Sequence, residues 1–134
     1  SYGTAGFRME GRKLSRVAFR CGVLAALRSK CLAGEATGLV VTASHNPVRD
    51  NGVKLIDTDG GMLHMSWEKH AEAVVGAHTK EDLVSALRNL WQVEGGDVSQ
   101  QQQQERKGKV FVARDTRPSG EVLLRATIQG IEST

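Results

Sequence analysis

A serine inside a short polar segment is the residue of this sequence best suited to chemistry. Ser44 follows the apolar run 38–42 and precedes His45, Asn46 and Pro47. A serine hydroxyl is a poor nucleophile unless a base or a charged pocket assists it, and its phosphate ester needs cationic and backbone N–H partners. The segment places a histidine, an amide and a rigid proline beside the hydroxyl. Ser44 is therefore a candidate for carrying a phosphoryl group.

Two other interpretations of this serine remain open at this point. A serine hydrolase is disfavoured because no Gly-x-Ser-x-Gly motif surrounds Ser44, and a histidine next in sequence is poorly placed to act as its base. A turn after a strand, with no catalytic role, accounts for Ser44 to Pro47 about equally well on these residues alone. The choice depends on the segments that accompany the motif.

A glycine-rich opening and a later loop each carry arginines that could bind an anion. Arg8 ends the run Gly3-Thr4-Ala5-Gly6-Phe7-Arg8, in which closely spaced glycines allow the backbone to approach a phosphate. Arg117 lies in the charged loop 114–119, after another strand-like run. Taken singly, either segment is also typical of a solvated turn.

Lys54 is a third candidate cation. It lies in the strand-like run 53–56 after Asp50-Asn51-Gly52, a strong turn signal that can bring it back towards Ser44. Alternation along a strand also predicts an outward lysine at this position without any function. Convergence of Arg8, Ser44, Lys54 and Arg117 on one cleft is therefore a prediction for the structure.

Helical and strand-like patterns alternate along the chain and predict the elements that position these residues. Apolar spacing predicts helices over 17–31, from Ser66, over 79–91 and over 121–130, and short β-rich runs predict strands over 38–42, 53–56 and 109–113. This order predicts an α/β fold, a layered sheet flanked by helices, in a single domain over 1–134.

Three local expectations follow from the same patterns. The first helix should bury one face, with Arg16 and Arg20 elsewhere around it. Ser66 is the expected N-cap of the second helix, and Thr79 with Asp82 should start the third. Residues 97–108, which include the glutamines from 100 to 104, are predicted to be a solvated low-complexity loop insertion.

Composition narrows the class of protein. The 18 basic and 15 acidic residues give a net charge of +3, but the basic residues are scattered and aromatics are 4%, so nucleic acid is not an expected partner. An apolar run of about 18 residues is absent, so no membrane association is expected.

Cys21 and Cys31, about 15 Å apart on one helix, are expected to be free thiols, which suits the cytoplasm. The ends, without a starting methionine, suggest an excised piece of a longer protein.

Three motifs together resemble the first domain of the α-D-phosphohexomutase family. That domain has a Gly-Thr-x-Gly-x-Arg opening, a Ser-His-Asn-Pro phosphoserine loop and an Arg-Asp-x-Arg loop, and this sequence has GTAGFR, TASHNP and ARDTRPS in the same order along nearly its whole length. Within the family, TASHNPVRDNGVKLID, DGGML and SWEKHA are most similar to members that act on N-acetylglucosamine phosphates.

The resemblance implies a mechanism and roles for individual residues. Phosphorylated Ser44 would donate to the sugar phosphate, and the resulting bisphosphate would reorient and return its other phosphoryl group to the serine. Ser44, through its phosphate, would be one ligand of Mg²⁺, the remaining ligands lying outside this chain, and a hexose bisphosphate would act as primer. His45 and Lys54 are implied in proton handling, Arg8 and Arg117 in electrostatic support, and Arg8, Asn46 and Arg117 in binding phosphate.

The family has four domains, and its acidic metal loop, sugar-recognition loop and distal phosphate loop belong to the later three. The resemblance therefore implies that this chain alone is inactive and that the missing domains and a sugar phosphate are its partners. Two alternatives stay open: the same domain of a mutase for another hexose phosphate, and a phosphate-binding or interaction module without turnover.

Overall fold

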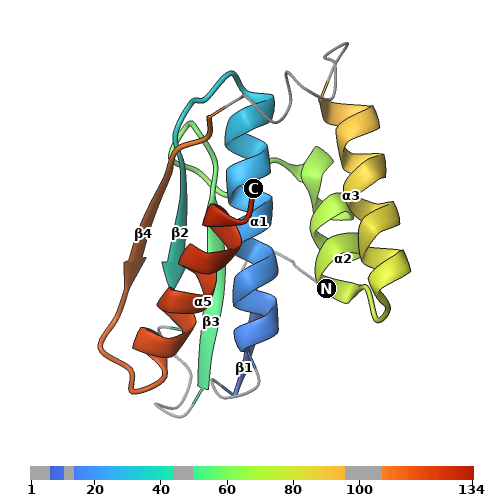
Figure 1. The fold of residues 1–134 in the computed structure, drawn as a ribbon. Helices are drawn as coiled ribbons and strands as arrows, with labels where there is room; N and C mark the ends of the chain where they lie inside the picture. Colours follow the sequence, from blue (N-terminus) through green and yellow to red (C-terminus); the bar gives the residue numbers. More distant parts are fainter. Residues whose placement is uncertain (1–6, 11–13, 44–49, 96–106) are drawn as a thin grey trace.

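The structure is a computed structural model that describes residues 7–10, 14–43, 50–95 and 107–134. Four strands form one mixed sheet in the order β1-β3-β2-β4 (Figure 1). They are β1 (Phe7–Glu10), β2 (Thr37–Val41), β3 (Asp50–Ile56) and β4 (Val110–Arg114). β3 is antiparallel to β1 and β2, whereas β2 and β4 are parallel, so the carboxyl ends of β2 and β4 lie side by side.

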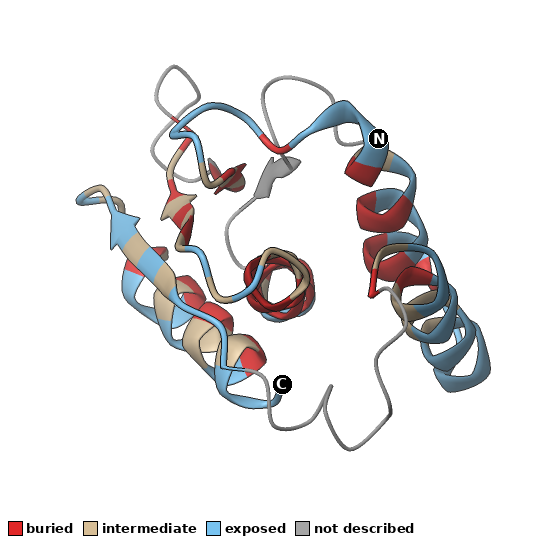
Figure 2. Ribbon diagram, turned by 90° about the horizontal axis from the view of Figure 1, so that it is seen from above, coloured by how far each residue is buried: buried red, intermediate tan, exposed pale blue. Residues whose placement is uncertain are grey.

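The helices form layers on one side of the sheet. They are α1 (Ser15–Cys31), α2 (Glu68–Gly76), preceded by the 3-10 turn η2 (Met65–Trp67), α3 (Lys80–Glu94) and α5 (Gly120–Glu132). Figure 2 shows α1 between the sheet and the pair α2 and α3, with α5 beside α1 on the sheet. The predicted α/β architecture, a layered sheet flanked by helices, is confirmed.

α1 is buried on nearly every side, and the expectation of a single buried face is wrong. The reason is that α5 packs closely along α1, and α2 contacts α1 on the side away from the sheet. Arg20, expected on the outer side, is 9% exposed, and its Nη1 donates to the carbonyl oxygens of Val74, Val75 and Ala77 at 3.0, 3.1 and 2.6 Å. Arg20 thus supplies donors to the carbonyls that the end of α2 leaves unpaired.

Glycines allow α1 and α5 to touch through their backbones. A Cβ atom on Gly22 would lie 2.2 Å from the carbonyl oxygen of Thr127, and one on Gly130 would lie 2.0 Å from that of Phe19. Both distances are far below van der Waals contact. The two helices can therefore lie this close only with glycine at these positions.

A buried carboxylate fixes the connection between β3 and α2. Asp57 accepts hydrogen bonds from Nε and Nη2 of Arg28, both at 3.1 Å, and from the backbone N–H groups of Thr58 and His64, both at 2.8 Å. The guanidinium of Arg28 also lies over the ring of Trp67, 5.2 Å from its centroid. Together these contacts hold the segment after β3 against α1.

Two local expectations are wrong, one because of a strand partner distant in sequence and one because of a neighbouring histidine. Residues 50–52, expected as a turn, begin β3, because β1 pairs with them: Glu10 lies opposite Asp50 and Arg8 opposite Gly52. Ser66 is not the N-cap of a helix but lies inside η2, and its backbone N–H is accepted by Nδ1 of His64.

The expected start of the third helix is confirmed. Thr79 accepts from the backbone N–H of Asp82 at 3.0 Å and caps α3. Cys21, buried inside α1, is a free thiol. Within the described parts of the chain, the helices are too short or too polar to cross a bilayer. The glutamines from 100 to 104 lie outside the described residues.

We expect Gly22→Ala to destabilise the fold by about 2–3 kcal/mol, because the new methyl group must push the backbones of α1 and α5 apart. Urea unfolding of the chain at pH 7 measures this change. Gly76→Ala is the matched control: a methyl group at this position on α2 would meet no atom of the described residues within 4 Å, so the unfolding free energy should stay within about 0.5 kcal/mol of the wild type. Equal stability of the two variants would contradict the backbone contact.

We also expect the stability of the chain to depend on the ionisation of Asp57. Burial opposes ionisation of this carboxyl, but hydrogen bonds from Arg28, Thr58 and His64 and the charge of Arg28 outweigh it and lower its pKa. Because the pKa is lower in the folded state, the ionised carboxylate stabilises the fold at pH values above the unfolded-state pKa of about 3.9. This contribution is lost as the pH falls through the folded-state pKa. Asp57→Asn should cost about 2–3 kcal/mol at pH 7 and progressively less below about pH 4.

Urea unfolding at pH 7 and pH 3 tests this dependence. Asp59→Asn is the control, because Asp59 is exposed and its Oδ1 accepts only a local hydrogen bond from Gly61 at 2.8 Å among the contacts described for it. The control should follow the wild type at both pH values. A cost for Asp57→Asn that is the same at pH 3 as at pH 7 would rule out the charge of Asp57 as its source.

Candidate functional site

The carboxyl ends of β2 and β4 meet and continue to bond beyond the strands. The register places Val41 opposite Arg114. One residue further on, the backbone N–H of Asp115 donates to the carbonyl oxygen of Val41 at 3.2 Å, and that of Thr42 donates to the carbonyl oxygen of Gly52 at 2.9 Å. The segments that follow β2 and β4 therefore leave the sheet at one place. We call this place the strand-end site, formed by Thr42, Ala43, Asn51, Asp115 and Arg117.

Arg117 joins the two segments. Its side chain is 11% exposed, its Nη2 donates to the carbonyl oxygen of Ala43 at 2.7 Å, and its Nε donates to Oδ2 of Asp115 at 2.9 Å. Ala43 is the residue directly before Ser44. The guanidinium predicted to give electrostatic support is thus held one residue from the serine predicted to carry the phosphoryl group.

The predicted residues Ser44, His45 and Asn46 lie outside the described residues, as does Pro47. Their expected roles remain predictions. What the structure does place is the chain directly before them, in which Val41 and Ala43 are fully buried.

The backbones of Arg8 and Lys54 lie near the same end of the sheet. Arg8 pairs with Gly52, whose carbonyl oxygen accepts the N–H of Thr42, so these backbones lie on adjacent strands at one level. Lys54 pairs with Val40 and lies two residues, or about 7 Å, further along β3 than Gly52. It is half-buried on the sheet face opposite the helices, which agrees with simple alternation.

Sequence reasoning does not select three polar groups of the strand-end site. Oδ2 of Asp115 accepts from Oγ1 of Thr42 at 2.7 Å. Asn51 is fully buried, its Nδ2 donates to Oγ of Ser119 at 3.0 Å, and its Oδ1 accepts from the N–H of Gly52 at 2.9 Å. The sequence pattern predicts a turn at Asn51. The feature that could have identified this residue is its position just before the strand-like run 53–56.

Asp115 is anionic at neutral pH. Its partial burial opposes ionisation, but hydrogen bonds from Thr42, from the backbone and side chain of Arg117, and the charge of that arginine together lower its pKa. Both carboxylate oxygens already accept hydrogen bonds. In the described ranges, moreover, no group of three or more His, Cys, Asp or Glu side chains is arranged to hold a metal ion.

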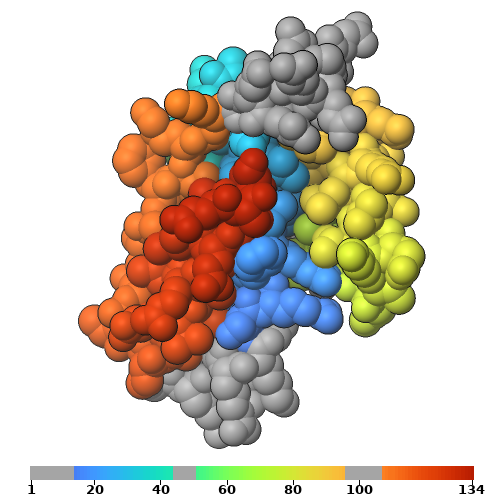
Figure 3. Space-filling model, viewed as in Figure 1, coloured from blue at the N-terminus to red at the C-terminus, as the bar shows by residue number. Residues whose placement is uncertain are grey.

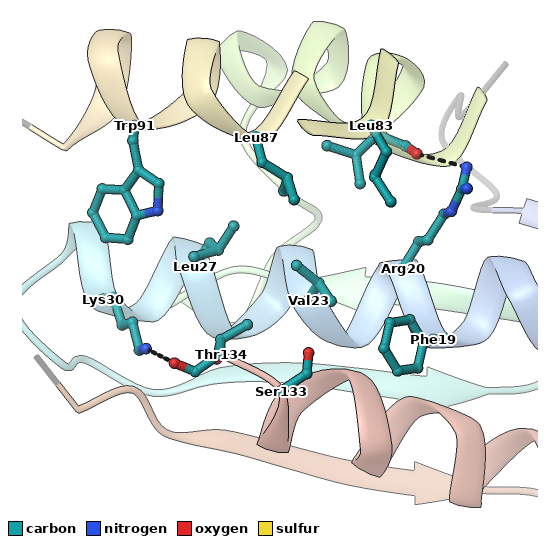
Figure 4. A pocket seen from close by; sticks show the side chains of 11 residues that line it. Phe19, Arg20, Val23, Leu27, Lys30, Leu83, Leu87, Trp91, Ser133 and Thr134 are labelled. Atoms are coloured by element: carbon teal, nitrogen blue, oxygen red, sulfur yellow. Dashed lines mark hydrogen bonds between the residues drawn. The ribbon is translucent and has the colours of Figure 1, made fainter. Parts of the chain in front are cut away.

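A separate hollow lies far from this site. It has a volume of about 370 Å³ and is lined mainly by apolar side chains of α1 and α3, including Val23, Leu27, Leu87 and Trp91. Figure 3 shows α1 at the bottom of this hollow between α5 and α3, and Figure 4 shows the lining side chains. Because α1 separates the hollow from the sheet, it is not part of the strand-end site.

Comparison with known proteins agrees with this geometry. The family model described as phosphoglucomutase/phosphomannomutase, alpha/beta/alpha domain I, matches residues 23–82. The chain is 47% identical to the phosphoacetylglucosamine mutase of Oryza sativa over 99% of its length, and 44% identical to that of Homo sapiens over 97%. It spans only 23% and 22% of the length of these two relatives.

Solved structures show the same relationship. A crystal structure of N-acetylglucosamine-phosphate mutase in its product complex, described as a member of the α-D-phosphohexomutase superfamily, has a TM-score of 0.88 and 43% identity, with 99% of this chain and 24% of that chain covered. The Aspergillus fumigatus N-acetylphosphoglucosamine mutase, solved with GlcNAc-6P and magnesium, has a TM-score of 0.79 and 42% identity, with 98% and 23% covered. The chain therefore belongs to the α-D-phosphohexomutase family and corresponds to its first α/β/α domain.

Proposed function

We propose that the protein containing this chain interconverts N-acetylglucosamine 6-phosphate and N-acetylglucosamine 1-phosphate through a bisphosphate intermediate, with Ser44 as the phosphoryl carrier. The observation that carries the proposal is the fixed guanidinium of Arg117 at the carbonyl of Ala43, the residue before Ser44. A phosphoserine needs cationic partners close to it, and this arrangement supplies one from the loop after β4. The choice of sugar rests on the relatives named above.

The other predicted residues receive roles consistent with their places on the sheet. We assign Arg8 and Lys54 to the same end of the sheet as Ser44, with Lys54 and His45 handling protons and Arg8 and Asn46 binding phosphate. The backbone register of Arg8 with Gly52, and of Lys54 with Val40, supports this assignment. Proton transfer requires the acid or base within hydrogen-bond reach of the reacting oxygen, which the bound sugar would have to satisfy.

Mg²⁺ and a hexose bisphosphate primer are the proposed cofactors, as in the related Aspergillus fumigatus enzymes solved with magnesium and with glucose 1,6-bisphosphate. The described residues do not form a site for the ion by themselves. The carboxylate of the strand-end site, Asp115, is engaged by Thr42 and Arg117. We therefore place the ligands other than phosphorylated Ser44 outside this chain, and we assign no step of the reaction to the metal here.

The same proposal extends to domain organisation and location. We treat 1–134 as the first domain of a longer enzyme, with 97–108 as a loop insertion, because the curated relatives are about four times as long. The remaining domains and a sugar phosphate are its partners. We also propose a cytoplasmic location, with which the buried, free thiol of Cys21 is consistent.

We expect Ser44→Ala to abolish conversion by the full-length protein, with a fall in kcat of at least about 10³-fold, because the group that accepts and returns the phosphoryl is removed. The assay uses N-acetylglucosamine 6-phosphate, Mg²⁺ and glucose 1,6-bisphosphate. Ser85→Ala is the matched control, since Ser85 is exposed on α3 and should leave the rate unchanged.

Three outcomes would revise the proposal. Full activity of Ser44→Ala would remove the serine from its role. Conversion of glucose or mannose phosphate, but not of N-acetylglucosamine phosphate, would keep the mechanism and change the substrate. No conversion of any hexose phosphate, combined with phosphate binding that is lost in Arg117→Ala, would favour the binding module without turnover.

A further inference from the structure

Asp115 receives hydrogen bonds from both segments of the strand-end site. Its Oδ2 accepts from Oγ1 of Thr42 at 2.7 Å and from Nε of Arg117 at 2.9 Å, and its Oδ1 accepts from the backbone N–H of Arg117 at 3.1 Å. Its own backbone N–H donates to Val41. Asp115 thus connects the chain that leads to Ser44 with the loop that carries Arg117.

These bonds close a ring. The path runs from Thr42 to Asp115, from Asp115 to Arg117, and from Nη2 of Arg117 back to the carbonyl oxygen of Ala43 at 2.7 Å. Thr42 and Ala43 are adjacent, so the ring holds one short stretch of backbone at two successive residues. A closed ring restricts the guanidinium more than any single bond in it, because each bond limits the freedom of the next.

The chemistry of Asp115 does not fit a direct role in proton transfer. A general base works best with a pKa near the working pH, and the hydrogen bonds from Thr42 and Arg117 move the pKa of Asp115 in the opposite direction. Its oxygens are directed to donors within the protein rather than left for a ligand. A carboxylate with these partners is suited to orienting another side chain.

We infer that Asp115 is a positioning residue for the proposed phosphoryl transfer: by binding Thr42 and Arg117 together, it fixes the guanidinium of Arg117 against the residue that precedes Ser44. The inference rests on the proposed function. It assigns Thr42 a role as well, since its hydroxyl is the donor that fixes Asp115 from the side of β2. Displacement of a catalytic group by about 1 Å is enough to slow an enzyme about 100-fold.

The test uses the full-length protein with Asp115→Asn, Thr42→Val and Thr42→Ser. Valine has nearly the shape of threonine but cannot donate to Asp115, whereas serine keeps the hydroxyl. Asp115→Asn and Thr42→Val should each lower kcat by about 10- to 100-fold, with KM changed less than about threefold, and Thr42→Ser should recover most of the rate. Glu121→Gln is the control carboxylate: it pairs with Arg125 on the exposed face of α5 and should behave as the wild type.

A double variant separates positioning from simple loss of stability. If Thr42 and Asp115 act as one unit, Thr42→Val combined with Asp115→Asn should be no slower than Asp115→Asn alone. A double variant whose loss of rate is the product of the two single losses would overturn the inference. So would a wild-type kcat in Thr42→Val, or a raised KM with kcat unchanged.

Hydrogen exchange of the Asp115 amide gives a readout that does not need turnover. This amide donates to Val41, and loosening of the ring should speed its exchange at least about 10-fold in Thr42→Val but not in Thr42→Ser. If the wild-type protein converts no hexose phosphate, the proposed function fails, and exchange alone decides whether Asp115 fixes the two segments. Unchanged exchange in Thr42→Val would overturn the positioning role in either case.

Discussion

The parallel pairing of β2 with β4 is the constraint on which the rest of the structure depends. All of β3, α2 and α3 lies between these strands in sequence, so no local interaction could bring Ala43 and Arg117 together. The register that sets Val41 opposite Arg114 places the next residues of both segments within hydrogen-bond reach. A shift of one residue would also turn the buried side chains of β2 to the open face of the sheet, which fixes the register strongly.

α1 supports that pairing from the opposite end of the strands. Thr37, the first residue of β2, donates through Oγ1 to the carbonyl oxygen of Ala25 at 2.9 Å, and the backbone N–H of Lys109, just before β4, donates to Oγ of Ser29 at 2.8 Å. Both strands thus begin at fixed points on one helix and end at the ring around Asp115. Because α1 is enclosed by protein, it can serve as a rigid reference for both.

The elements with strong periodicity can be predicted from the sequence, and those defined by distant partners cannot. The third helix follows from its capping threonine and apolar spacing, both of which are local properties. β1 and the start of β3 form because each pairs with the other, and Arg20 is buried because α2 ends beside it. The local sequence around these residues does not reveal such distant partners. In the site, Thr42 and Asp115 lie inside the motifs TASHNP and ARDTRPS, but their sequence positions do not single them out, because their importance lies in the hydrogen bond between them.

The ring around Asp115 changes how Arg117 can act on a phosphate. An arginine and a carboxylate bonded at 2.9 Å form a pair with no net charge, so at long range the pair attracts an anion weakly. The value of Arg117 then lies in the direction of its guanidinium and in the order it imposes on the backbone before Ser44. Long-range attraction of the substrate would have to come from cations outside such pairs, so the strand-end site contributes an oriented guanidinium that acts at short range.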